Sequence, residues 1–280
     1  MKTWEKDLPR KQYSTLKKIN QSQPWFEVYE VLSGIYAIYE PYQFQEVISY
    51  LICGSEKALL WDTGNGIGNM KQLVDELWNK EIIVLNSHCH FDHIGSNSEF
   101  DLVHVFDHPM MIQIMEHGVG QDVLDKQYSL DTFSDNSPID YHQVVHRRCH
   151  YVTVQEHTAF DLGNRLMEVI YTPGHSLDSI MLVSQKEKLL FTGDTVYPAA
   201  LYCFDGSDFD AYVKTMKQLS KTYSDYTLLM SHNEPLGKGK RLTELAHFFQ
   251  MIQDGQLSCT MKEHLECYEW KDYSLLKNRK

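Results

Sequence analysis

The chain has 280 residues, with 26 Lys and Arg against 38 Asp and Glu, and its formal net charge is −12. This length allows one large domain or two small ones, with a core that needs no disulfide staples. Apolar residues make up 42% of the chain and aromatic residues 12%, which excludes wholesale disorder. Because nucleic-acid binding normally requires a basic surface, the acidic balance argues against a DNA or RNA partner.

The six cysteines show no C-x-x-C spacing, which is typical of reduced thiols in a reducing compartment. Residues 1–18 contain no apolar run of the signal-peptide type. The sequence contains no stretch of about 18 apolar residues, so it predicts no membrane span. We therefore expect a cytoplasmic protein without a membrane span, and the sequence predicts no oligomeric state.

Residues 1–24 are polar and basic, and we expect an extension or a short surface helix. Runs of apolar and alternating residues then predict paired strands, followed by a helix over residues 70–79 and two more strands. The strands expected in this half are 26–32, 35–39, 47–53, 57–62, 82–86 and 102–106.

Residues 109–150 are the least regular part, and we interpret them as an insertion that begins with a helical stretch. Apolar runs beyond it predict strands over 165–171, 180–184, 188–192 and 227–231, and an edge strand near the end, within 267–277. Helices are expected over 208–220, with Asp208 as N-cap, and over 241–254. Strands and helices in two halves indicate one α/β domain over 25–280, with two sheets and helices outside.

The segment SHCHFDHIG follows the strand at 82–86 and carries His88, His90, Asp92 and His93. Two residues spaced two apart in an extended segment point to the same side, so His88 and His90 should lie together. Cys89 then points the other way and is not expected to be a ligand. Imidazole and carboxylate groups are the ligands that zinc and similar divalent metals prefer, so this segment predicts a metal site.

Three further polar residues follow buried apolar runs: His175 in YTPGHS, Asp194 in FTGDT and His232 in MSHNE. A single residue of this kind at a strand end is more often structural than a ligand. Functional sites, however, gather in the loops at strand ends. Together with the histidine segment, these residues predict one shared site.

The segments LLWDTG, SHCHFDH, TPGHS, TGDT and SHNE, in this order, resemble the five signature motifs of the metallo-β-lactamase-fold hydrolases. The resemblance covers roughly residues 26–235. It implies an αββα sandwich of two mixed β-sheets flanked by helices, with a two-metal site along one edge. The implied ligands are His88, His90 and His175 for one metal and Asp92, His93 and His232 for the other, with Asp194 bridging both and Asp62 orienting the ligand loop by hydrogen bonds.

Two divalent cations are expected as cofactors, with zinc first and iron or manganese as alternatives. They would activate a shared water as hydroxide for attack on a carbonyl or phosphorus, so no Ser or Cys nucleophile is required. Asp92, both ligand and acceptor, would orient that hydroxide. Tyr197, in GDTVY, resembles a tyrosine of lactonase-type members of the family, and its phenol would donate to a developing oxyanion. The alternative for Tyr197 is simple packing.

We expect a small-molecule substrate with a thioester, lactone or other carboxylic ester bond. Asp194 argues against a native β-lactam substrate, because β-lactamases of the family usually lack an aspartate there. The negative charge argues against the nucleases of the family. Only residues 233–280 follow His232, which is short for the glutathione-binding extension of glyoxalase-II-type thioesterases, and the layout is similar to the acyl-coenzyme-A thioesterase-like branch.

Other activities of related folds stay open: an iron-dependent, persulfide-dioxygenase-like reaction, or β-lactamase or phosphodiesterase activity on the same site. An acyl substrate would require an apolar slot. The aromatic residues expected to form it are Tyr39, Tyr42, Phe44, Phe91, Tyr128 and Phe133.

Overall fold

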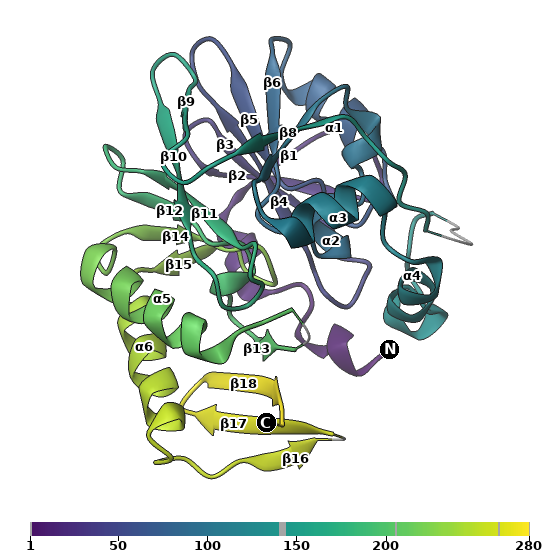
Figure 1. The fold of residues 1–280 in the computed structure, drawn as a ribbon. Coiled ribbons are helices and arrows are strands. Elements are labelled where there is room, and N and C mark those ends of the chain that lie inside the picture. The colour runs from purple at the N-terminus through teal and green to yellow at the C-terminus, as the bar shows by residue number, and fades with distance from the viewer. Residues whose placement is uncertain (1, 140–143, 205, 263, 280) are drawn as a thin grey trace. The chain divides into compact units, whose positions relative to one another are not determined.

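The computed structural model describes residues 2–139, 144–204, 206–262 and 264–279 (Figure 1). The chain divides into two compact units, one of Met1–Gln155 with Phe160–Leu166 and one of Glu156–Ala159 with Met167–Lys280. Each unit contains helices and at least one β-sheet, which confirms the α/β class. The proposed limit between an extension and a single domain, at residues 24 and 25, stays a prediction.

The first unit is built on an eight-stranded sheet whose strands follow chain order from β1 to β8. Neighbours pair antiparallel from β1 to β5 and parallel from β5 to β8, so the sheet is mixed. Its strands are β1 (Lys17–Ile19), β2 (Glu27–Leu32), β3 (Ile35–Tyr39), β4 (Ile48–Cys53), β5 (Ala58–Trp61), β6 (Ile82–Leu85), β7 (Val103–Phe106) and β8 (Tyr151–Val154).

The strands at the centre of this sheet are buried on both faces, as their apolar sequences predict. All four residues of β5 and five of the six in β4 are buried. Helix α1 (Met70–Leu77) starts at Asn69, whose side chain accepts a hydrogen bond from the Gln72 amide at 2.8 Å. The other helices of the unit are α2 (Phe91–Ile94), α3 (Pro109–His117) and α4 (Gln121–Gln127).

Two further sheets consist mainly of residues of the second unit. In the six-stranded sheet the order is β15-β14-β12-β11-β10-β9, in which β12 and β14 are parallel neighbours. The four-stranded sheet has the order β13-β18-β17-β16. The strands are β9 (Ala159–Asp161), β10 (Leu166–Tyr171), β11 (Ile180–Ser184), β12 (Leu189–Phe191), β13 (Ala200–Cys203), β14 (Thr227–Leu229), β15 (Leu236–Lys238), β16 (Thr260–Lys262), β17 (Leu265–Trp270) and β18 (Tyr273–Asn278).

Helices α5 (Phe209–Thr222) and α6 (Lys240–Gln253) lie side by side in this unit (Figure 1). The Asp208 side chain accepts a hydrogen bond from the Ala211 amide at 3.0 Å, which confirms the predicted N-cap. Both helices bury apolar faces in one core, where the Tyr212 and Phe249 rings meet edge to face at 4.7 Å. This burial against the sheet accounts for most of their stability.

Three regions differ from the expectation. The described residues of the N-terminal segment, 2–24, include two 3₁₀ helices, Thr3–Asp7 and Lys11–Thr15, and the edge strand β1. The insertion contains α4 besides the expected helical start. The sequence of α4 is mostly polar, and the helix is held by its buried residue Leu124. Residues 140–143 of the insertion lie outside the described part. The chain end forms a hairpin of β17 and β18 rather than a single edge strand.

All six cysteines are free thiols, in agreement with the expectation of reduced cysteines. Among the described residues, no helix has the length and apolar character that a membrane crossing requires.

Candidate metal centre

The loop after β6 carries the first ligand group, which we define as His88, His90, Asp92 and His93. Ligand atoms of His88 and His90 lie within 4.8 Å of each other, as do those of Asp92 and His93. The two rings of His88 and His90 are 4.5 Å apart, which agrees with the prediction that both point to one side. Cys89 points away and packs in the apolar core.

Helix α2 begins directly after His90 and places Asp92 and His93 on its first turn. Asp92 and His93 are buried, whereas His90 is half-buried. Gly95 ends this helix against the loop that follows β5. A Cβ atom at Gly95 would lie 2.3 Å from the Asn65 carbonyl carbon, so only glycine allows the two loops to approach this closely.

Asp62 contacts this group through its two carboxylate oxygens. Oδ1 accepts from the Ser87 amide at 2.7 Å, and Oδ2 accepts from the Ser87 hydroxyl at 2.9 Å and lies 2.9 Å from His93 Nδ1. Asp62 sits at the end of β5 with φ of 64°, a left-handed conformation that Asp adopts more readily than most residues. This network is fully buried, so it fixes the orientation of the loop.

The same contacts determine which nitrogen of each ring carries the proton. A carboxylate can only accept, so His93 holds its proton on Nδ1 and its lone pair on Nε2. Ser87 gives its single hydroxyl hydrogen to Asp62, so its oxygen accepts from Nδ1 of His88, 2.9 Å away. Both imidazoles therefore present Nε2 as a ligand atom, the arrangement that metal-binding histidines adopt.

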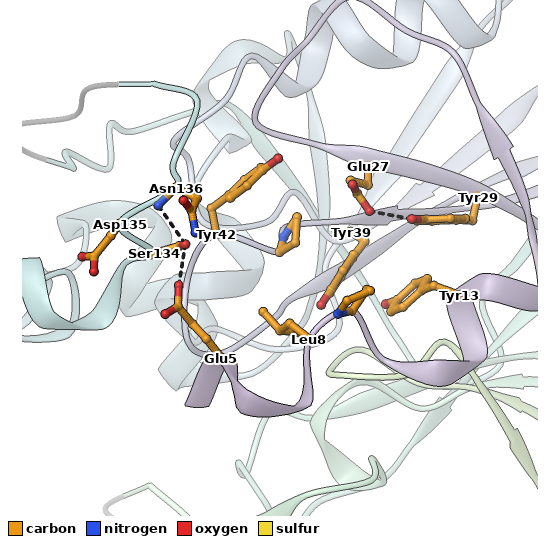
Figure 2. Close-up of a pocket in the computed structure, with 12 residues that line it drawn as sticks. Glu5, Leu8, Tyr13, Glu27, Tyr29, Tyr39, Tyr42, Ser134, Asp135 and Asn136 are labelled. Atoms are coloured by element: carbon orange, nitrogen blue, oxygen red, sulfur yellow. Dashed lines mark hydrogen bonds between the residues drawn. The ribbon is translucent and has the colours of Figure 1, made fainter. Parts of the chain in front are cut away.

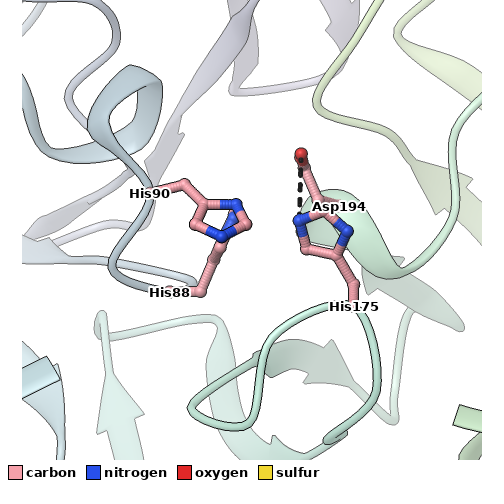
Figure 3. A group of neighbouring side chains, drawn as sticks. All are labelled: His88, His90, His175 and Asp194. Atoms are coloured by element: carbon pink, nitrogen blue, oxygen red, sulfur yellow. Dashed lines mark ion pairs between the residues drawn. The ribbon is translucent and has the colours of Figure 1, made fainter. Parts of the chain in front are cut away.

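The second ligand group consists of His175, Asp194 and His232 in the second unit. They follow β10, β12 and β14 respectively, as the sequence predicts. His175 Nε2 lies 3.6 Å and His232 Nε2 lies 3.1 Å from Asp194 Oδ2, and His232 Nε2 lies 2.9 Å from Oδ1. Figure 3 shows the contact between His175 and Asp194, and draws His88 and His90 of the first ligand group.

His175 also has a defined tautomer. Its Nδ1 lies 3.0 Å from the Tyr202 carbonyl oxygen, which can only accept, so Nε2 carries the lone pair. Gly174 precedes it at φ of 157°, and a Cβ atom there would lie 2.6 Å from Tyr212 Cα. Glycine thus lets the loop pack against α5 and deliver His175.

Both ligand groups fit a divalent cation. Two ligand atoms at about 2.0 Å from a tetrahedral cation lie roughly 3.3 Å apart. The nitrogen–oxygen distances within each group, 3.5 Å for His93 Nε2 to Asp92 and 2.9–3.6 Å around Asp194, match that separation. The donors are neutral imidazoles and carboxylates, which are borderline-soft and hard ligands suited to zinc, iron or manganese.

Gln45 is a residue of this site that the sequence analysis missed. It lies in the loop between β3 and β4, and its Nε2 donates to Asp92 Oδ2 at 3.1 Å. That loop is bound to the insertion, because the Phe44 amide donates to the Thr132 carbonyl at 2.8 Å. A lone glutamine in a loop has no distinctive sequence signal. Ser87, by contrast, stands directly before His88 in the sequence, next to the ligand motif.

We expect Gln45→Leu to weaken zinc binding about tenfold, because Asp92 loses a hydrogen-bond donor that orients it. Competition with a chromogenic chelator measures this change. Gln72→Leu, on the exposed side of α1, is the matched control and should bind zinc like the parent chain. Equal affinities in both variants would show that Gln45 does not orient Asp92.

Glu40 is a second residue that the sequence analysis did not identify. Its carboxylate is buried and accepts from Trp25 Nε1 at 2.5 Å, and from the Asn65 amide and side chain at 3.0 Å each. Tyr128 donates to the Asn65 side chain at 2.9 Å, so the network reaches the insertion. Burial raises the pKa of Glu40 to about 7, and these donors only partly offset that effect.

Between pH 4.5 and 7 the folded chain therefore keeps a proton on Glu40 that the unfolded chain releases. The free energy of unfolding should fall as pH rises through this window. The free energy of unfolding of Glu40→Gln, relative to that of the parent chain, should therefore rise by up to about 3 kcal/mol between pH 4 and pH 8. Urea unfolding in zinc-free buffer measures the free energy of unfolding of both chains at each pH. Glu116→Gln, at an exposed position, is the control, and its difference from the parent chain should not depend on pH. A pH-independent difference for Glu40→Gln would contradict the account.

Tyr197 is buried beside the second ligand group, with its ring 4.9 Å from that of His232. Its hydroxyl donates to the Ala200 carbonyl at 2.9 Å. The phenol has one hydrogen, so a substrate oxyanion would have to compete with Ala200 for it. The oxyanion role of Tyr197 stays a prediction.

The aromatic residues expected to line an acyl slot pack partly against one another. Phe91 meets Tyr128 edge to face at 5.4 Å, and Tyr128 lies 6.0 Å from Phe133. Trp25 links Phe133 at 6.1 Å to Tyr42 at 5.7 Å. Phe133 and Tyr128 are buried, whereas Phe91 and Tyr42 are half-buried. Of the other two expected residues, Phe44 is half-buried and Tyr39 is buried, so Phe91, Tyr42 and Phe44 are the members of the set that are partly exposed.

Comparison with known proteins identifies the fold and the family. The model of the metallo-beta-lactamase superfamily matches residues 45–232. The solved structure of a metallo-beta-lactamase family protein from Thermus thermophilus superposes with a TM-score of 0.60 at 19% identity, over 81% of this chain and 83% of that one. This likeness supports the predicted fold.

Several curated relatives are named as thioesterases. The human acyl-coenzyme A thioesterase MBLAC2 is 26% identical over 172 residues, which are 54% of this chain and 59% of the relative. The atrochrysone carboxyl ACP thioesterase of Aspergillus chevalieri is 27% identical over 160 residues, 55% of this chain and 42% of the relative. The matches thus span about three fifths or less of these two relatives. The chain belongs to the metallo-beta-lactamase superfamily.

Proposed function

We propose that this protein is a metal-dependent hydrolase that cleaves a carboxylic thioester, with lactones and other esters as the neighbouring substrate classes. The observation that carries the proposal is the pair of ligand groups, in which His88, His93 and His175 each present Nε2 with the proton held on Nδ1. Two relatives named as thioesterases favour the thioester bond over other acyl bonds.

In this proposal the two ligand groups together hold two divalent cations, zinc in the first instance. The residues assigned to one cation are His88, His90, His175 and Asp194, and those assigned to the other are Asp92, His93, Asp194 and His232. Asp194 would bridge both, and Asp62 would keep the first ligand group in place. Bound there, the cations would polarise a carbonyl oxygen and make a water molecule more acidic.

In the proposed reaction, side chains of this protein orient the attacking water and the acyl group. Asp92 accepts a proton from the attacking water and holds the water in line, while Gln45 donates a hydrogen bond to Oδ2 of Asp92 and so keeps that carboxylate fixed. Half-buried Phe91, beside the ligands in sequence, gives the acyl group an apolar contact. The negative net charge of the chain favours a small substrate over a nucleic acid.

A hydrolysis panel on the zinc-loaded chain tests this function. It compares acyl-coenzyme A and glutathione thioesters, homoserine lactones, β-lactams, phosphodiesters and a persulfide with oxygen. We expect the highest kcat/KM with a thioester. Preferred cleavage of a β-lactam or phosphodiester, or oxygen uptake with a single bound iron, would contradict the proposal.

The role of Tyr197 has its own test. If its phenol leaves Ala200 and donates to the oxyanion, Tyr197→Phe should lower kcat about 10- to 1000-fold with little change in KM. Steady-state kinetics with the best thioester measure this. Tyr226→Phe, whose hydroxyl donates to Gln185 on the surface of the same unit, is the control. An unchanged kcat would make Tyr197 a packing residue.

A further inference from the structure

A cavity of about 420 Å³ lies in the first unit, between the 3₁₀ helices of the N-terminal segment, β2, β3 and residues 134–136 (Figure 2). Its size is within the range of small-molecule sites. Aromatic and aliphatic side chains, among them Tyr29, Tyr42 and Leu8, form most of its wall. None of its lining residues belongs to either ligand group.

Tyr13 supplies this cavity with an unused hydrogen-bond donor. Its side chain is 4% exposed, and within the described residues its hydroxyl has no hydrogen-bond partner. The other two buried phenols of the wall are engaged, because Tyr39 donates to Glu46 at 2.6 Å and Tyr29 donates to Glu27 at 2.5 Å. Figure 2 shows the Tyr13 hydroxyl turned toward Tyr39 and Leu8, into the space that these residues enclose.

The Tyr13 hydroxyl stays protonated and can donate. Burial and the nearby Tyr39 phenol raise the pKa of Tyr13 well above its ordinary value. The ring itself is fixed, since it stacks on Tyr39 at 4.3 Å and lies 4.8 Å from Tyr29. A buried hydroxyl without a partner costs free energy, and a ligand that accepts its hydrogen removes that cost.

The charges of the wall decide which ligands fit. Three carboxylates line the cavity, those of Glu5, Glu27 and Asp135, and its lining includes no Lys, Arg or His. Glu5 accepts from Ser134 at 2.6 Å, and Glu27 pairs with Lys18 outside the wall at 2.5 Å. An anion would meet these carboxylates without a cation of its own in the wall, which disfavours it.

We propose that this cavity is a binding site for a small, flat, uncharged organic molecule that stacks on the tyrosine rings and accepts a hydrogen bond from Tyr13. The site is additional to the metal centre and its reaction. Because it involves none of the ligand residues, its occupancy does not require a metal and can be measured without any activity.

The test uses 4-fluorobenzamide, which has a flat ring and a carbonyl acceptor, and its anionic counterpart 4-fluorobenzoate. Fluorine NMR titration of the full chain should show saturable binding of the amide, with Kd on the order of 1 mM or tighter. The benzoate should bind at least about tenfold more weakly. Tyr13→Phe should weaken the amide about five- to tenfold, whereas Tyr226→Phe should not. The affinity of the chain for 4-fluorobenzamide should be the same in the presence of zinc and in the presence of a chelator.

A second variant covers the case in which Tyr13→Phe does not fold. Leu8→Trp should fill the cavity and abolish amide binding, whereas Leu130→Trp, at an exposed position of the same unit, should leave it unchanged. Three results would overturn the proposal: no saturable binding of the amide, equal binding in the folded Tyr13→Phe or Leu8→Trp chain, or binding that disappears with the chelator. The hydrolase proposal is unaffected by any of them.

Discussion

Asp194→Ala should remove at least one of two zinc ions per chain and lower thioester hydrolysis by a factor of about 1000 or more. Asp194 carboxylate oxygens lie 2.9–3.6 Å from the Nε2 atoms of His175 and His232, so its loss leaves the second ligand group without its anionic donor. A bridging carboxylate also neutralises part of the charge of two cations. Metal analysis after gel filtration, together with kcat/KM, measures both effects.

The control for this substitution is Asp208→Ala, which removes an aspartate of the same unit outside the ligand groups. Asp208 caps α5, so its loss should lower the free energy of unfolding by about 1 kcal/mol and leave zinc content and rate unchanged. If Asp194→Ala kept two zinc ions and the parent rate, Asp194 would not be a bridging ligand.

Asp62→Asn should weaken zinc binding about 10- to 100-fold, although Asp62 itself is not proposed to touch a metal. An amide NH₂ group in place of one oxygen would face the donors of Ser87 or His93. The rings of His88 and His93 would then lose the contacts that keep their protons on Nδ1. Chelator competition measures the affinity, and ¹⁵N chemical shifts of the imidazoles report the tautomers.

The same change should also destabilise the fold by about 3 kcal/mol, because it breaks a fully buried network. Asp75→Asn, at a surface ion pair with Lys71 on α1, is the matched control and should change neither property by much. Parent-like zinc affinity and unchanged imidazole shifts in Asp62→Asn would show that Asp62 does not set the tautomers.

The sequence predicted the elements that place the ligands, because each has a strong local pattern. The strands before His88 and His232 are mainly apolar, and the last two residues of each are buried, while α5 has both an N-cap at Asp208 and a clear apolar face. Strand ends with polar residues then indicated where the site residues would gather. The resemblance to a known family supplied the division of these residues between two metals, which local patterns alone do not give.

The parts that the sequence did not predict depend on tertiary contacts. Strand β1 is short and largely exposed, and it exists because Lys17–Ile19 pairs with β2. Buried Glu40 and half-buried Gln45 lie in or next to a polar loop, and the bridge between Gln43 and Phe133 fixes that loop against the insertion. Similarly, Tyr13 lies in a polar segment, and its burial follows from stacking on Tyr39.

The most direct test of the hydrolase account is a zinc titration of the metal-free chain, with the initial rate of acyl-coenzyme A hydrolysis as readout. We predict that the rate rises with added zinc and reaches its plateau at two zinc ions per chain. A plateau at one ion, or two bound ions without hydrolysis of any thioester, lactone or ester, would contradict the account.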